Sequence, residues 1–457
     1  MIISSRRRFL TLGLAGAGTL VFPGATVLEA AEPVPEPHFF LLIVMNGGAD
    51  PSYMFDARPL SMTAAGRIQN YLGKDPDAWS GANGARTFAS ELVKPLARFR
   101  DRFSVINGVH MAQSFDGHLQ NMNFLFTGDP FGGDSFVPHL NLAETGREPK
   151  SLDAVLPTDP VQSSLRNHSG VIPLRVGSIG GLSDYLRRIA PPHPEDELMS
   201  FVRGRIAASE QGAGRMAAAA ALMHTALDRA PEVHDRLAKL TPPDPNQDPE
   251  QQCLSLIAQC FRLSLSRSAI YVLPEQFDVH AANLAKDQPK LFGDALGRVA
   301  SLLKGLETTP FNERQSLFDV TSIMIASEFG RTLRAPDRPV DDTGTNHNPH
   351  ANSIILGGKG VRPGLVIGAT DFNNAGEAVS KAHLALDPEL EKTIGRPFDF
   401  ATMRPRNDLP ENFDIADYLT IGSVINTLYG VFRVPKAHYR TIGNGGPAAP
   451  VLYGLES

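Results

Sequence analysis

The sequence HFFLLIVMNGGAD, residues 38–50, contains seven consecutive apolar residues from Phe39 to Met45 and then a polar, glycine-containing turn. An apolar run of this length without alternation predicts a strand that is covered on both faces. Such strands occur in parallel sheets packed between helices. Asn46 and Asp50 are the first polar side chains after this strand, and the two glycines between them let the backbone bend close to a ligand.

Further apolar runs of strand length recur along the chain and alternate with amphipathic helical stretches. The predicted strands are residues 103–107, 171–177, 269–273, 321–327 and 352–358, and the predicted helices are residues 90–99, 216–239, 251–266, 291–306 and 415–431. This alternation predicts an α/β fold, a three-layer sandwich with a mostly parallel central sheet. A proline-bracketed segment near residues 190–250 predicts a helical insertion or an ordinary crossover helix pair.

Acidic residues, histidines and a serine follow the predicted strands. In an open parallel sheet, ligands bind beyond the carboxyl ends of the strands, so these residues are the candidates for a site. Besides Asn46 and Asp50 they are His110, Ser114, Asp116 and His118 after residues 103–107, Asp278 and His280 after residues 269–273, Glu328 after residues 321–327, and Asn346, His347 and His350 before residues 352–358.

These residue types favour a divalent metal site. Zinc and manganese accept mixed aspartate, glutamate and histidine ligands, and such an ion activates a nearby hydroxyl or water as a nucleophile. Each feature alone is weak, because a single Asp-x-His pair such as Asp278 and His280 is more often a solvated turn and Ser114 equally suits a helix cap. The convergence on one sheet edge carries the prediction.

The first 31 residues predict an export signal. Arg6, Arg7 and Arg8 precede Phe9, Leu10 and a glycine- and alanine-rich apolar run. This order is typical of a twin-arginine signal peptide, with cleavage near Ala30 or Ala31. We therefore expect a periplasmic or extracellular protein that contacts the twin-arginine translocase during export, with residues 32–457 as its mature domain.

Composition excludes several other classes of protein. With 42% hydrophobic and 20% charged residues the chain is globular, and a net charge of -6 gives no nucleic-acid-binding footprint. No later segment reaches the roughly 18 apolar residues of a membrane span. Cys253 and Cys260 lie seven residues apart on a predicted helix, about 10 Å along its axis, too far for a disulfide.

Several of these motifs resemble the domain-of-unknown-function 1501 family. The similarity rests on NGGAD, SFDGHLQNMNFLFTG, FDVHAANL, SEFGRT, GTNHNPHANSIILGG and VRPGLVIGATD, and it covers the chain from about Phe39 to Tyr429. Members are exported bacterial proteins related to the alkaline phosphatase and sulfatase superfamily. The resemblance implies an alkaline-phosphatase-like fold with one or two divalent ions, such as zinc or manganese, at the carboxyl edge of the sheet.

The resemblance also assigns roles to individual residues. It implies that Asp50, Asp278, His280, Glu328, Asn346 and His347 form the metal site, with Glu328 either a ligand or an outer carboxylate, and that Ser114 and His118 are catalytic. The sequence departs from the family where Asn346 replaces the usual aspartate, and from the wider superfamily where Met45 and Asn46 replace a metal-binding aspartate after the first strand. Both changes remove negative charge and weaken the prediction of a second ion.

Two functions remain open. The first is an exported metal-dependent hydrolase that acts on phosphate or sulfate esters, including glycan esters, with a metal-activated serine or water as nucleophile. The second is a non-catalytic protein that retains the fold and binds an envelope glycan or a protein partner. A nucleotide-binding oxidoreductase is disfavoured because neither NGGAD (residues 46–50) nor GSIGG (residues 177–181) has the required G-x-G-x-x-G spacing.

Overall fold

The computed structural model describes the greater part of the chain after residue 36, and residues 37–457 form one unit of it. The predicted export signal and Ser114 lie outside the described residues. The structure describes residues 37–61, 71–111, 117–128, 134–140, 155–156, 174–175, 197–211, 217, 220, 235–236, 238–281, 286–332, 345–371, 381–386, 392–408, 410–442 and 447–455.

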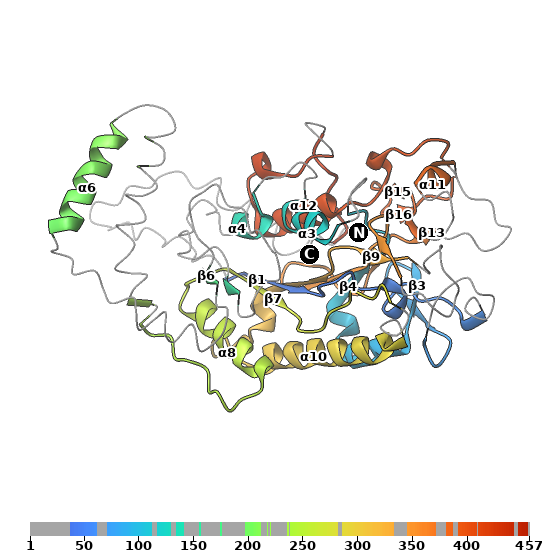
Figure 1. Cartoon of the computed structure of the whole chain (residues 1–457), viewed down its shortest axis with the longest axis horizontal. Coiled ribbons are helices and arrows are strands. Elements are labelled where there is room, and N and C mark those ends of the chain that lie inside the picture. The colour runs from blue at the N-terminus through green and yellow to red at the C-terminus, as the bar shows by residue number, and fades with distance from the viewer. Residues whose placement is uncertain are drawn as a thin grey trace, which may run out of the picture. The chain divides into compact units, whose positions relative to one another are not determined.

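The central feature is an eight-stranded sheet with the order β12-β4-β11-β8-β1-β7-β5-β6 (Figure 1). Strand β1 (Phe39–Val44) lies between β8 (Thr321–Ala326) and β7 (Ser268–Val272), and it pairs with both in parallel. The other strands are β4 (Phe103–Ile106), β5 (Val155–Leu156), β6 (Leu174–Arg175), β11 (Ile354–Gly358) and β12 (Val366–Ile367). The mixed α/β class with a mostly parallel sheet is therefore confirmed.

One inner strand runs against the others. Strand β11 pairs antiparallel with both β8 and β4, whereas the pairs that β12 makes with β4, β5 with β7, and β5 with β6 are parallel. The reversal of β11 places its amino end at the sheet edge where β1, β7 and β8 have their carboxyl ends. Residues that precede β11 therefore share this edge with residues that follow the parallel strands.

Helices cover both faces of the sheet, as the continuous apolar run of β1 predicts. Its residues Phe39, Leu41 and Ile43 belong to a core with α8 (Pro249–Arg262), α10 (Gln288–Thr308) and η2 (Glu91–Arg102). Its residues Phe40, Leu42 and Val44 face a second core with α3 (His118–Thr127), α4 (Phe136–His139) and α12 (Ile421–Phe432), on the opposite side in Figure 1. Burying each such side chain contributes about 1.5–3 kcal/mol, so register is strongly fixed.

Four of the five predicted helices form with local differences, and most of the fifth, residues 216–239, lies outside the described residues. The helix predicted at residues 90–99 is the 3₁₀ helix η2, which begins after the N-cap Ser90 and contains Pro95, a residue without an amide hydrogen. Residues 415–431 divide into the 3₁₀ turn η4 (Ile415–Asp417) and α12, because Thr420 caps α12 by accepting a hydrogen bond from the Ser423 amide at 3.2 Å. Cys253 and Cys260 are free and buried in α8.

Short elements complete the described part of the chain. Four two-stranded ribbons are β2 (Asp77–Ser80) with β3 (Arg86–Ala89), β9 (Gly330–Arg331) with β10 (His347–Asn348), β13 (Thr370–Asp371) with β14 (Ile394–Gly395), and β15 (Phe398–Asp399) with β16 (Arg404–Pro405). The remaining helices are η1 (Pro51–Tyr53), α6 (Glu197–Glu210), η3 (Phe318–Val320), α11 (Lys381–Leu386) and η5 (Lys436–His438). Among the described residues, no helix has the length and apolar character needed to span a membrane.

Candidate metal centre

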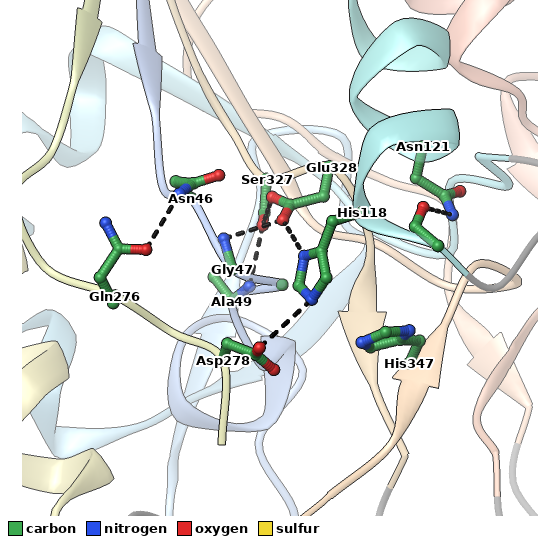
Figure 2. Close-up of polar contacts among 12 residues, drawn as sticks. Asn46, Gly47, Ala49, His118, Asn121, Gln276, Asp278, Ser327, Glu328 and His347 are labelled. Carbon is green, nitrogen blue, oxygen red and sulfur yellow. Dashed lines mark hydrogen bonds and ion pairs between the residues drawn. The ribbon is translucent and has the colours of Figure 1, made fainter. Parts of the chain in front are cut away.

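Four side chains from three parts of the chain meet at the carboxyl edge of the sheet. His118 begins α3, Asp278 and His280 follow β7, and His347 lies in β10 just before β11. Each offers one ligand atom, and these atoms all lie within 4.8 Å of one another. We call this set the four-residue group, and Figure 2 shows Asp278, His118 and His347 around the same space.

The buried carboxylate of Glu328 contacts the imidazole of His118. Its Nδ1 lies 2.9 Å from Oε1 of Glu328, and its Nε2 lies 3.5 Å from Oδ2 of Asp278 (Figure 2). In the tautomer that donates from Nδ1 to Glu328, Nε2 presents a lone pair toward the group. Within the described part of the chain, this buried Nε2 has no hydrogen-bond partner.

Glu328 is fixed by the loop that follows β1. Its side chain has no exposed surface, and Oε1 also accepts the Gly47 amide hydrogen at 2.8 Å. Ser327 fastens the same loop, since its hydroxyl donates to the Met45 carbonyl at 2.7 Å and accepts from the Ala49 amide at 2.8 Å. Glu328 is thus placed to orient His118 and is not a member of the four-residue group.

His280 and His347 face each other across the group. Their Nε2 atoms are 2.9 Å apart, and Nε2 of His280 lies 3.1 Å from Oδ1 of Asp278. On its other side, Nδ1 of His280 lies 3.3 Å from Oδ1 of Asn346. Asn346 therefore contacts His280 in the position where outer partners orient metal-ligating histidines.

The ring of Phe329 packs against two of the imidazoles. The centroid of the buried Phe329 ring lies 4.8 Å from that of His118 and 4.4 Å from that of His347. Phe329 follows Glu328 directly, so the segment that supplies the carboxylate also supplies this apolar support. Such packing restricts the rotamers of both histidines.

Arg331 controls the charge of Asp278. Partial burial raises the pKa of this carboxyl, but the hydrogen bond from Arg331 at 2.7 Å and the guanidinium charge outweigh burial, so the pKa of Asp278 is lowered overall. Burial, followed by the charge of Arg331, lowers the pKa of His280. An ionised carboxylate and neutral imidazoles are the protonation states that bind a metal.

The two glycines after β1 serve packing within the protein. Gly47 has φ +106°, and a Cβ there would lie 2.6 Å from the Asp278 amide nitrogen; Gly48 has φ +79°, and a Cβ there would lie 2.1 Å from the Phe329 ring. The sequence predicted that these glycines admit a ligand. In the structure they admit the backbone that carries Asp278 and the ring beneath the histidines.

Other residues that the sequence singled out lie outside the four-residue group. Asp50 is buried as the N-cap of η1 and accepts the Ser52 amide hydrogen at 2.9 Å, and burial raises its pKa to about 6. His350 is also buried, with its ring 5.8 Å from that of His110. Arg331 is the site residue that the sequence analysis missed, since nothing in the spacing of SEFGRT indicates a buried arginine.

The donor set of the four-residue group fits a zinc or manganese ion. Three imidazoles and one carboxylate are ligands that both metals accept, and zinc takes four such ligands. Nε2 of His118 is buried and has no hydrogen bond to any residue that the structure describes, and such an atom is the kind of donor that a metal satisfies. Glu328 and Asn346 supply the outer contacts that fix ligand orientation.

Comparison with known protein families gives a match to part of the chain. No curated protein matches the chain. The family described as "Protein of unknown function (DUF1501)" matches residues 178–400, a range that contains Asp278, His280, Glu328, Arg331 and His347. This match supports placing the chain in the DUF1501 family.

Proposed function

We propose that this chain is an exported metal-dependent hydrolase of phosphate or sulfate esters, with an alkaline-phosphatase-like arrangement of sheet and helices. The observation that carries the proposal is the convergence of His118, Asp278, His280 and His347 within 4.8 Å at the carboxyl edge of the sheet. In open α/β sheets this edge is where ligands bind.

The exposure of the group suits a substrate that arrives from solvent. The side chains of His118, Asp278 and His280 are 30%, 46% and 45% exposed, whereas Glu328 behind them is fully buried. A divalent ion bound there would polarise the ester oxygens and lower the pKa of a bound water. The protein's own contribution is to orient His118 through Glu328 and to keep Asp278 ionised through Arg331.

The reaction is displacement at phosphorus or sulfur. Water, or Ser114 followed by water, attacks the central atom, the bond to the ester oxygen breaks, and the alcohol leaves with a proton. Ser114 precedes His118 by four residues, which places the two in one segment of the chain. No cysteine or serine stands in the C/S-x-P-x-R context of formylglycine sulfatases, and this favours phosphate esters.

Metal content is the first test of this function. The mature protein, purified without added metal, is analysed for bound ions beside Asp278→Ala, His347→Ala and the control His438→Ala, whose histidine is outside the group. We expect the wild type and the control to hold zinc, manganese or a similar ion, and both group variants to lose it. Hydrolysis of p-nitrophenyl phosphate and p-nitrophenyl sulfate by the same samples then tests the reaction.

The same experiment separates the hydrolase from a binding protein. A wild type that comes out empty and cannot be loaded with metal would remove the catalytic proposal and leave the non-catalytic role, with a glycan or protein partner. Metal without turnover of either ester would retain the site and reject this chemistry.

Export by the twin-arginine pathway is a separate part of the proposal. It rests on Arg6, Arg7 and the apolar run after them. We expect replacement of Arg6 and Arg7 by lysine to leave the chain in the cytoplasm, as measured by cell fractionation. Unchanged periplasmic delivery of that variant would reject the pathway.

A further inference from the structure

A buried arginine lies against the four-residue group. The side chain of Arg331 has no exposed surface, although arginine is rarely buried without partners. It is part of β9, which pairs with β10 so that Arg331 is opposite His347. Its Nη1 lies 3.5 Å from Nε2 of His280, so the guanidinium borders the space that the ligand atoms enclose.

Besides its contact with His280, this guanidinium donates hydrogen bonds to oxygen atoms. Nε donates to the Gly48 carbonyl at 3.0 Å, Nη1 to the Thr345 carbonyl at 3.1 Å, and Nη2 to Oδ1 of Asp278 at 2.7 Å and to the Gly47 carbonyl. Three carbonyls and one carboxylate form a ligand set that a hard metal cation such as Mn²⁺ also accepts.

The carboxylates predicted as metal ligands surround this same arginine. Asp278 binds it directly, and Glu328 and Asp50 attract it through their charges. A buried cation needs such compensation, because removing a charge from water is costly. The negative charge at this edge of the sheet is therefore partly neutralised by the protein itself.

We infer that Arg331 is the built-in second cation of a centre that holds one divalent ion. The inference rests on the metal centre of the proposed function and specifies its composition. Arg331 is a positioning residue, since its buried guanidinium acts through Asp278 and the loop carbonyls.

Two further observations support one ion. Oδ1 of Asp278 lies 2.7 Å from Arg331 and 3.1 Å from Nε2 of His280, whereas Oδ2 lies 3.5 Å from Nε2 of His118, so Oδ1 is shared with the arginine and Oδ2 contacts the group alone. The charges agree with this division. When ionised, Asp50, Asp278 and Glu328 carry three negative charges. Arg331 neutralises one of them, so a single divalent ion would neutralise the other two.

The test is the number of manganese or zinc ions bound at saturation, measured by equilibrium dialysis and elemental analysis. We expect one equivalent in the wild type. We also expect one in Arg331→Lys, which keeps the charge, and one in the control Arg440→Met, which removes a different buried arginine outside the group. Arg331→Met opens the oxygen acceptors and should bind a second equivalent of manganese, which millimolar guanidinium displaces.

The outcomes separate this inference from the proposed function. Two equivalents in the wild type, or one in a folded Arg331→Met that does not respond to guanidinium, would overturn the inference even if esters are hydrolysed. One equivalent in the wild type without hydrolysis would reject the reaction and keep the inference. If Arg331→Met does not fold, the count in the wild type and in Arg331→Lys decides, and two equivalents in either overturns it.

Discussion

Oε1 of the fully buried Glu328 lies 2.9 Å from Nδ1 of His118 and fixes which nitrogen of that imidazole faces the four-residue group. A carboxylate behind a metal-ligating histidine typically changes metal affinity by about 10–100-fold when it is removed. Glu328→Gln keeps an oxygen for the Gly47 amide hydrogen but loses the charge. We expect its zinc affinity to fall within that range, as measured by competition with a fluorescent chelator.

The control for this prediction is Glu307→Gln. Glu307 lies in α10 and pairs with Arg98 at 2.8 Å, outside the group. Loss of one carboxylate there changes the net charge equally and leaves His118 untouched. Equal zinc affinities in wild type and Glu328→Gln would show that Glu328 does not act through the imidazole.

Asn346 gives a variant that should bind metal more tightly. Its Oδ1 lies 3.3 Å from Nδ1 of His280, so it accepts from the imidazole without supplying charge. In Asn346→Asp the acceptor is a carboxylate, and charge-assisted hydrogen bonds are shorter and stronger. We expect zinc affinity to rise about tenfold, in line with outer-ligand effects. A weaker or unchanged affinity in the chelator competition would contradict this role for Asn346.

The mostly parallel sheet, and the approach of Asp278 and Glu328 at its edge, could be predicted because both follow from local patterns. The apolar run of β1 is buried on both faces, and Asp278 and Glu328 follow parallel neighbours of β1. Residues at the carboxyl ends of adjacent parallel strands meet at one edge, so order along the chain was enough to bring these two together.

Strand direction and buried charge could not be predicted in this way. An apolar run has the same pattern in either direction, so nothing local indicated that β11 runs antiparallel to β8. That reversal is what brings His347, which precedes β11, to the same edge as Asp278. Arg331 has the local pattern of a surface residue, and only its tertiary contacts with Gly47, Gly48 and Thr345 account for its burial.

Gly47 tests the link between the loop after β1 and Asp278. A Cβ there meets the Phe277 and Asp278 backbone at 2.7 and 2.6 Å, and φ is +106°. Gly47→Ala must therefore displace the segment that carries Asp278, beyond the cost of about 1–3 kcal/mol for an unfavourable backbone conformation. We expect both lower stability in urea unfolding and weaker zinc binding.

Gly84→Ala is the matched control. Gly84 also has a positive φ, +76°, but its Cβ would meet nothing within 4 Å. This variant is destabilised by the unfavourable backbone conformation alone and should bind zinc like the wild type. If Gly47→Ala loses stability and still binds zinc normally, the loop does not position Asp278.

The raised pKa of Asp50 predicts how the stability of the protein depends on pH. Burial raises its pKa from 3.8 to about 6, so between these values the folded protein binds more protons at this site than the unfolded chain. Stability must then fall as pH rises from about 4 to 6 and level off above. Asp50→Asn keeps an acceptor for the Ser52 amide and removes the titration. The free energy of unfolding of Asp50→Asn minus that of the wild type should increase by up to about 3 kcal/mol as pH rises from about 4 to 6, since each pKa unit corresponds to about 1.4 kcal/mol.

Urea unfolding of chelator-treated protein at several pH values between 4 and 7.5 measures this difference without a contribution from bound metal. Asp244→Asn is the matched control, because Asp244 accepts the amide hydrogen of Asn246 at 2.9 Å in the same i to i+2 contact at an exposed position. A constant difference between Asp50→Asn and wild type across the range would mean that the buried carboxyl of Asp50 does not titrate there. A difference that shrinks as pH rises would mean that the ionised carboxylate stabilises the fold, through its attraction to Arg331, more than its burial costs.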